Sequence, residues 1–177
     1  MTGNVARAFR QHPQFEQTGV GEYRTLENQF PGELTVIDSD GSAAREYRLT
    51  ITTPTLDAVV EGETVAEVVA DGWFETLERR LGDANDVAET DATPPIVERD
   101  GEEVVITVEF PDADPERVAD DAVAVVEFVE GTWVQGIIPG YDYGEPAASL
   151  REQAMQNYQQ EGAGGPGQSD GSRGPRP

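Results

Sequence analysis

Apolar and polar residues alternate with a period of two in the first part of the chain, which predicts strands. In the segment 45–53, residues 47, 49 and 51 are apolar, whereas residues 46, 48, 50 and 52 are charged or Thr, as in a half-buried strand. The β-rich segments 23–30 and 33–38 precede it, separated by turns that contain Gly, Pro or Asp. A short amphipathic helix over residues 3–12, ended by Pro13, comes before these strands. The apolar face of 45–53 consists of Tyr47, Leu49 and Ile51.

The period then changes to that of a helix over residues 64–81. Thr64 and Glu67 have the spacing of a capping box at its start, and Gly82 follows its end. Apolar residues recur every four positions on one side, as expected for a helix that packs on a core. These residues are Val65, Val69, Trp73 and Leu77.

A hairpin and two further helices complete the pattern. The dipeptide Asp100-Gly101 predicts a two-residue turn that pairs Val97 with Val104. Asp114 is the expected cap of a helix that Gly131 ends. After that helix we expect an extended segment, Trp133 to Ile138, a turn-rich loop at 139–144 and a helix over 147–160. In the second strand of this hairpin the expected core residues are Val104, Ile106, Val108 and Phe110.

The element order α-β-β-β-α-β-β-α therefore predicts an α+β fold with a mainly antiparallel sheet of about five strands. Helices pack on this sheet, and the last helix forms a C-terminal helical arm. We expect a single acidic domain over residues 1–160. Residues 161–177 are rich in Gly and Pro and carry no large apolar residue, so we expect a disordered tail.

Charge indicates the medium in which this domain works. The chain has 35 acidic residues and 12 basic ones, all of them Arg, for a net charge of −23. At about 1 M salt the Debye length is roughly 3 Å, so such a charge repels itself little. The composition favours a halophilic protein with a highly hydrated surface. A nucleic-acid mimic would need the acids in one stripe, and they are spread along the whole domain.

Two resemblances follow from longer strings. The string from Trp73 to Leu81 (WFETLERRL) and the string from Glu130 to Tyr143 (EGTWVQGIIPGYDY) resemble an uncharacterised haloarchaeal family, a domain of unknown function. The element order also resembles the type III secretion chaperone-like fold, which implies a small dimer that binds client proteins. Neither resemblance implies catalytic residues.

The chain offers no constellation that predicts catalysis, a cofactor or a metal site. His12 is its one histidine, expected to bond the last carbonyls of the first helix, and no Ser stands in a nucleophile-elbow motif. Acidic groups at 38–40 and 112–121 are what so acidic a composition produces without a binding role. There is no phosphate-binding loop and no basic patch, so we expect no nucleic-acid binding.

The sequence also indicates the cellular compartment of the protein. The chain has no Cys and therefore no disulfide framework. No apolar stretch is long enough to predict a membrane span or a signal peptide. We expect a cytoplasmic protein.

The stretch from Trp133 to Tyr143 is the candidate binding segment, because aromatic and branched residues alternate in and around it with Gly and Pro. Such residues provide contact area with few rotamers to freeze. The alternative is that they complete the core or form a homodimer seam. The candidate binding residues are Trp133, Ile137, Ile138, Tyr141 and Tyr143.

We therefore expect a non-enzymatic protein-interaction module, chaperone-like or adaptor-like, with a protein partner or self-association. The alternatives are a carboxylate-based enzyme, acting with or without Mg²⁺, and a small-ligand sensor, which would require an apolar cavity of several hundred Å³.

Overall fold

The computed structural model describes residues 2–38, 45–111 and 114–163 of the 177-residue chain. The helices of this part are α1 (Thr2–Gln11), α2 (Leu56–Val59), α3 (Glu67–Leu81), α4 (Pro115–Gln135) and α5 (Ala147–Ala163), with a 3-10 turn η1 (Ala84–Val87). Its strands are β1 (Phe15–Gly19), β2 (Glu22–Thr25), β3 (Gly32–Asp38), β4 (Arg45–Pro54), β5 (Val60–Glu61), β6 (Ile96–Asp100), β7 (Glu103–Pro111) and β8 (Asp142–Tyr143).

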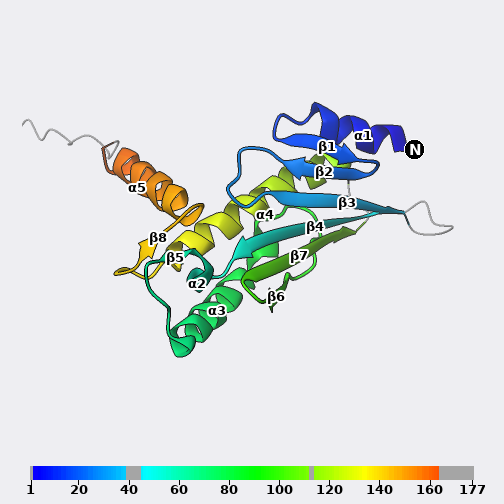
Figure 1. Cartoon of the computed structure of the whole chain (residues 1–177). Coiled ribbons are helices and arrows are strands. Elements are labelled where there is room, and N and C mark those ends of the chain that lie inside the picture. Colours follow the sequence, from blue (N-terminus) through cyan, green and yellow to red (C-terminus); the bar gives the residue numbers. More distant parts are fainter. Residues whose placement is uncertain (1, 39–44, 112–113, 164–177) are drawn as a thin grey trace, which may run out of the picture.

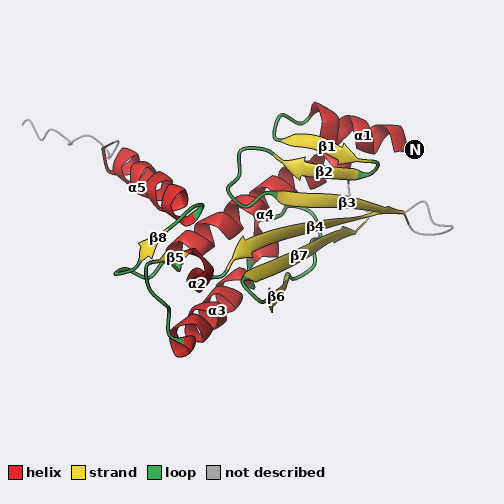
Figure 2. Cartoon of the chain, in the orientation of Figure 1, coloured by secondary structure: helices red, strands yellow, loops and turns green. Residues whose placement is uncertain are grey.

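Six strands form one antiparallel sheet in the order β1-β2-β3-β4-β7-β6 (Figures 1 and 2). The short strands β5 and β8 form a separate antiparallel pair. The predicted α+β class with a mainly antiparallel sheet is therefore confirmed. The additional edge strand, β1, contains a single large apolar residue, Phe15, so no alternation in the sequence could reveal it.

The first predicted strand is too long. β2 ends at Thr25, and Glu27 adopts a φ of 64°, a left-handed conformation that a strand does not accommodate. Thr25 also turns its hydroxyl to the neighbouring strand, where Oγ1 accepts a hydrogen bond from the Gly32 N–H at 2.9 Å. Residues 26–31 therefore form a loop between β2 and β3.

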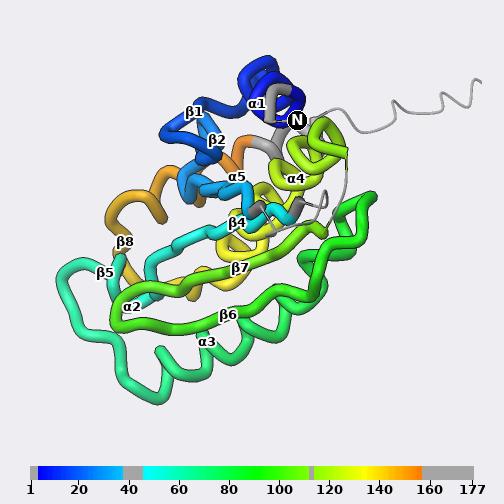
Figure 3. The backbone as a smooth tube through the Cα atoms, turned by 90° about the vertical axis from the view of Figure 1, so that its right-hand side faces the viewer, coloured from blue at the N-terminus to red at the C-terminus, as the bar shows by residue number. Residues whose placement is uncertain are grey.

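The sheet has one buried and one open face. Strands β4 and β7 pair from Glu46 to Pro54 of β4, and Leu49 and Val108, which lie opposite each other, are both buried. Helix α4 crosses this buried face, as Figures 1 and 3 show from two directions. On the open face Arg48 and Glu109 pair at 3.2 Å. The helices form one layer on one face of the sheet. The contact between α3 and the end of α4 therefore lies at the margin of the core.

The second hairpin has a different register from the predicted one. Its turn residues are Gly101 and Glu102, and Val97 lies opposite Ile106 instead of Val104. Gly101 has a φ of 60°, and glycine at the first turn position is one of the favoured hairpin types. Because the shift is an even number of residues, the predicted buried face of β7 is correct.

Helix α4 is longer than predicted, and the expected extended segment from Trp133 to Ile138 is wrong over its first part. The helix continues through Gly131 to Gln135. Val125, Val129 and Trp133 recur every four residues and are all fully buried. A Gly in a helix costs about 1 kcal/mol, whereas full burial of a large apolar side chain stabilises by roughly 1.5–3 kcal/mol. The buried stripe therefore outweighs the glycine.

The two long helices differ at their starts. Helix α3 begins at Glu67, and its N-cap is Ala66, which provides no side-chain bond, so the predicted capping box with Thr64 does not form. At α4 the predicted cap is confirmed, because Asp114 Oδ1 accepts a hydrogen bond from the Glu116 N–H at 3.2 Å.

Helix α5 projects from the body as the predicted arm (Figure 1). Its first turns are anchored by Ala147 and Leu150, both buried. The helix runs to Ala163, beyond the predicted domain end at residue 160. The predicted tail beyond Ala163 and most of the acidic group at 38–40 lie outside the described residues. Among the helices of the described ranges, none is long and apolar enough to cross a membrane.

Candidate binding groove

Trp133, the first residue of the candidate binding segment, belongs to the core. Its side chain is fully buried, and its Nε1–H donates to the Pro54 carbonyl at 3.0 Å. The ring lies edge-on to Phe30 and to Trp73, with centroid distances of 5.4 and 6.1 Å. Trp133 therefore offers no surface to a partner.

The other predicted residues lie together after the end of α4. Ile137 and Ile138 are half-buried. The Tyr143 hydroxyl donates to the Ile138 carbonyl at 2.5 Å and accepts from the Ile138 N–H at 3.1 Å. Tyr141 contacts the Tyr143 ring at a centroid distance of 6.4 Å. Tyr143 thus fixes the backbone of Ile138 where it passes over α3.

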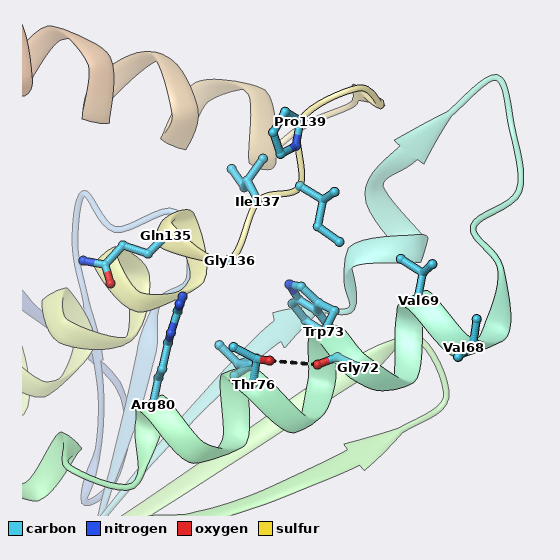
Figure 4. A pocket seen from close by; sticks show the side chains of 12 residues that line it. Val68, Val69, Gly72, Trp73, Thr76, Arg80, Gln135, Gly136, Ile137 and Pro139 are labelled. Atoms are coloured by element: carbon cyan, nitrogen blue, oxygen red, sulfur yellow. Dashed lines mark hydrogen bonds between the residues drawn. The ribbon is translucent and has the colours of Figure 1, made fainter.

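A groove of about 410 Å³ lies between α3 and this segment, and we call it the α3 groove (Figure 4). Its α3 side runs from Val68 to Arg80, and its other side consists of residues 135–139. Ile137 and Ile138 line it, whereas the other three predicted residues, at 133, 141 and 143, do not. Val68 is an apolar side chain that remains 77 % exposed at the rim.

The floor of the groove contains a buried donor with no partner. Trp73 is 5 % exposed, and its Nε1 makes no hydrogen bond within the described part of the chain. A buried polar group left unpaired costs about 1–3 kcal/mol. Gly136 lies directly over this atom, since a Cβ on Gly136 would be 3.2 Å from Nε1. The absence of a side chain at Gly136 is thus what gives the Trp73 N–H its room.

The groove also differs in charge from the rest of the molecule. None of its lining residues is Asp or Glu, although the chain has 35 of them. Arg80 lines the groove, and Figure 4 shows its side chain rising from α3 toward Gln135 and Gly136. Arg80 forms no ion pair or hydrogen bond with any described residue. The groove therefore carries a free cation in an acidic chain.

Trp73 and Arg80 are functional candidates that the sequence pattern missed. Trp73 falls on the apolar stripe of α3, which predicts a core residue, and its burial agrees with that prediction. The one available signal was Val68, an apolar residue beside the stripe rather than on it. An unpaired indole N–H could not be recognised, because its environment depends on where Gly136 packs.

The most buried carboxylate of the described residues holds a loop. Asp121 is 4 % exposed, and its two oxygens accept hydrogen bonds from the Glu89 N–H at 3.0 Å, the Thr90 N–H at 3.0 Å and the Thr90 hydroxyl at 2.6 Å. These bonds tie residues 88–91 to α4. All of these hydrogen bonds at Asp121 hold the loop to α4.

Glu130, which is also on α4, likewise accepts a hydrogen bond from the backbone of a loop. Burial raises the pKa of its carboxyl group, and the hydrogen bond from the Phe30 N–H, at 3.0 Å, opposes that shift. Among the described residues, no three acidic or histidine side chains converge as a metal site would require.

The His12 ring links the end of α1 to α4. The sequence predicted that this ring would bond the last carbonyls of α1, and it does not. Its Nδ1 accepts from the Gln14 N–H at 3.2 Å, so the ring proton lies on Nε2, which donates to Asp120 at 2.9 Å. A second hollow, of about 470 Å³, borders this pair. Both ring nitrogens are already bonded and Asp120 is 75 % exposed, so this hollow presents no unpaired buried group.

The fold and the groove define a small α+β protein whose helices cover one face of an antiparallel sheet and leave an apolar cleft beside α3. The chain belongs to a family of unknown function, DUF5813, whose model matches residues 10–153. The match extends from the end of α1 into α5 and includes the whole groove. No curated protein and no solved structure matches the chain significantly.

Proposed function

We propose that this protein is a non-enzymatic interaction module, chaperone-like or adaptor-like, that binds an apolar segment of a partner protein in the α3 groove. The observation that carries the proposal is the lining of the groove, which has apolar walls and no carboxylate in a chain with 35 acidic residues. Exposed apolar surface of this kind is typical of interaction sites.

The exposed rim supports binding of a macromolecule. Val68 and Pro139 stand on opposite sides of the groove, and both are exposed. Val68 cannot be explained by packing within the described chain, because 77 % of its surface is accessible. A second copy of the chain would be one such partner, which is how a homodimer would form.

A small-ligand sensor is the second candidate function. The groove volume of about 410 Å³ lies within the range of small-molecule sites, roughly 300–1,000 Å³. We favour the interaction module because the groove has exposed residues on both of its sides, Val68 on α3 and Pro139 after α4.

The module is proposed to act in a cytoplasm at molar salt. The net charge of −23 and the use of Arg for every basic residue support that setting. Salt also strengthens association of apolar surfaces, provided that the salt is excluded from the protein surface.

Photo-crosslinking in molar KCl tests the proposal. A benzophenone amino acid is placed at Val68, on the rim, or at Val20, which is fully exposed and lies outside the groove. We expect the Val68 position to yield a discrete adduct from a native lysate, identified by mass spectrometry, and the Val20 position to yield none. The same Val68 adduct should disappear when Ile137 is replaced by Glu.

The alternatives give different results. An adduct with a second copy of the chain would identify the partner as the protein itself. Equal labelling from Val68 and Val20, or an adduct that survives the Ile137→Glu substitution in a folded variant, would exclude the groove as the interaction site.

A further inference from the structure

Two nitrogen donors, one from Trp73 and one from Arg80, line the α3 groove. Trp73 Nε1 lies beneath Gly136, at 3.2 Å from where a Cβ would be. The Arg80 side chain rises from α3 toward the same residue (Figure 4). Neither nitrogen group has a partner among the residues that the structure describes. One donor is neutral and the other is charged, and the two oxygens of one carboxylate can each accept a hydrogen bond from a different donor.

Apolar walls adjoin these donors. Val69 of α3 and Ile138 of the segment that follows α4 line the groove together with Trp73. A ligand that satisfies the donors must therefore carry an apolar group close to its carboxylate. The lining contains no acidic side chain that would repel such a ligand.

We propose that the α3 groove recognises the carboxy-terminus of a partner polypeptide that ends in apolar residues. The terminal carboxylate binds Arg80 and Trp73 Nε1, and the last side chains lie against Val69 and Ile138. This proposal rests on the interaction module proposed above and specifies the chemistry of its partner.

A chain terminus fits better than an internal acidic residue. In the last residue of a chain the carboxylate and the side chain share one Cα, which is the short separation that the groove requires. An internal Asp or Glu would also bring a peptide group on each side into the apolar walls, and an unpaired buried peptide group is costly. Capture of a terminal carboxylate by backbone N–H groups is an established mode of peptide binding, and here side-chain donors take that role.

Binding requires a small movement of the segment 136–139. Arg80 is exposed and is available for the first contact, whereas Trp73 Nε1 is covered. The carboxylate therefore reaches the indole N–H after residues 136–139 shift away from α3. The hydrogen bonds from Tyr143 to Ile138 hold this segment in the closed position.

The test compares a labelled pentapeptide that ends in Leu-Val-Ile with the same peptide amidated at its carboxy-terminus, by fluorescence anisotropy in molar KCl. A charge-assisted hydrogen bond is worth enough for at least about a tenfold difference in affinity, with the free acid binding more tightly. Arg80→Gln should abolish the preference for the acid. Arg79→Gln is the matched control, since Arg79 is the adjacent exposed arginine outside the groove, and it should leave the preference unchanged.

The two indole groups provide a second readout in the unmodified protein. The chain has two Trp residues, and Trp133 Nε1–H is already bonded to Pro54. In a ¹H–¹⁵N spectrum the acid peptide should move the Trp73 indole signal and leave that of Trp133 in place.

Several results would overturn the proposal: equal affinity for acid and amide, an equal effect of the two arginine substitutions, or a Trp73 signal that does not move. Hexanoate that binds as tightly as the peptide would identify a small-acid site instead. If no peptide binds while the Val68 adduct persists, the partner chemistry is wrong and the interaction module stands.

Discussion

The two tryptophans lie in edge contact but differ in how their N–H groups are satisfied. Trp133 donates to Pro54, whereas Trp73 has no acceptor within the described residues. An unpaired buried donor destabilises the fold by about 1–3 kcal/mol. Such groups are rare in native proteins, and each one calls for an explanation, of which a bound group that accepts the hydrogen bond is one. At the residue scale, Trp73 is thus the strongest indication of where this protein binds.

Tyr143 gives a prediction at the same scale. Tyr143→Phe removes both hydrogen bonds to Ile138 and should lower the free energy of unfolding at pH 7 by about 1–3 kcal/mol. Tyr141→Phe is the matched control, because the Tyr141 hydroxyl makes no hydrogen bond to a described residue. Chemical denaturation in molar KCl measures both. An equal loss in the two variants would show that Tyr143 does not hold the segment.

The pH dependence of stability has a definite sign. Burial raises the pKa of the Tyr143 and Tyr23 hydroxyl groups above the ordinary value of 10.0. Below pH about 10 both groups are protonated in the folded and unfolded chains, and their contribution is fully present. As pH rises further the unfolded chain loses its protons first, so stability falls. Tyr143→Phe should make this alkaline decrease shallower, which a denaturation series above pH 9 would measure.

At the scale of elements, two glycines at the end of helix α4, Gly131 and Gly136, differ in whether a side chain can replace their hydrogen. Gly131 is exposed within the helix, and a Cβ there would meet nothing within 4 Å. Gly131→Ala should therefore stabilise the protein by about 0.5–1 kcal/mol. At Gly136 a Cβ would press on Trp73 Nε1 at 3.2 Å and on the Trp133 carbonyl at 3.3 Å. Gly136→Ala should destabilise by about 1–3 kcal/mol.

The two substitutions together test the contact between Gly136 and Trp73. Thermal unfolding should shift up for Gly131→Ala and down for Gly136→Ala. If Gly136→Ala were as stabilising as Gly131→Ala, the segment after α4 would not pack on the indole as described.

Elements with a strong internal pattern could be predicted from the sequence, and the others could not. The alternation over β4 and β7 and the cap at Asp114 identified these elements correctly. The edge strand β1 escaped because its pairing with β2, and not its own pattern, makes it a strand. The end of α4 was misplaced because Gly131 is a local stop signal that the burial of Trp133 overrides.

Some of the candidate binding residues line the groove and others do not, for the same reason. Ile137 and Ile138 line the groove, but Trp133 does not, because its position is decided by a contact with Pro54, far away in the sequence. Trp73 and Arg80 were missed because α3 reveals its apolar stripe locally but not what lies above it. A site formed between two elements requires their relative placement, which no single-segment pattern contains.

At the scale of the whole molecule, the acidic residues lie outside the α3 groove. The ion pairs of the described arginines are exposed or partly exposed, as in Arg24 with Glu33 and Arg48 with Glu109. Exposed pairs contribute about 0–1 kcal/mol. They leave most of the 35 acidic residues to repel one another when salt is low. An acid-free groove in this surface is a region where an apolar, anionic ligand meets the least repulsion.

Salt should therefore control stability. At 0.1 M the Debye length is about 10 Å, against 3 Å at 1 M, so repulsion among the unpaired acids grows as salt is removed. We expect the melting temperature to fall continuously from molar to 0.1 M KCl, by roughly 2–4 °C for each kcal/mol lost. Glu75 and Glu78 are exposed on α3 without ion pairs among the described residues, and replacing both by Gln should reduce the dependence. A melting temperature independent of KCl in both proteins would contradict the halophilic interpretation of the charge.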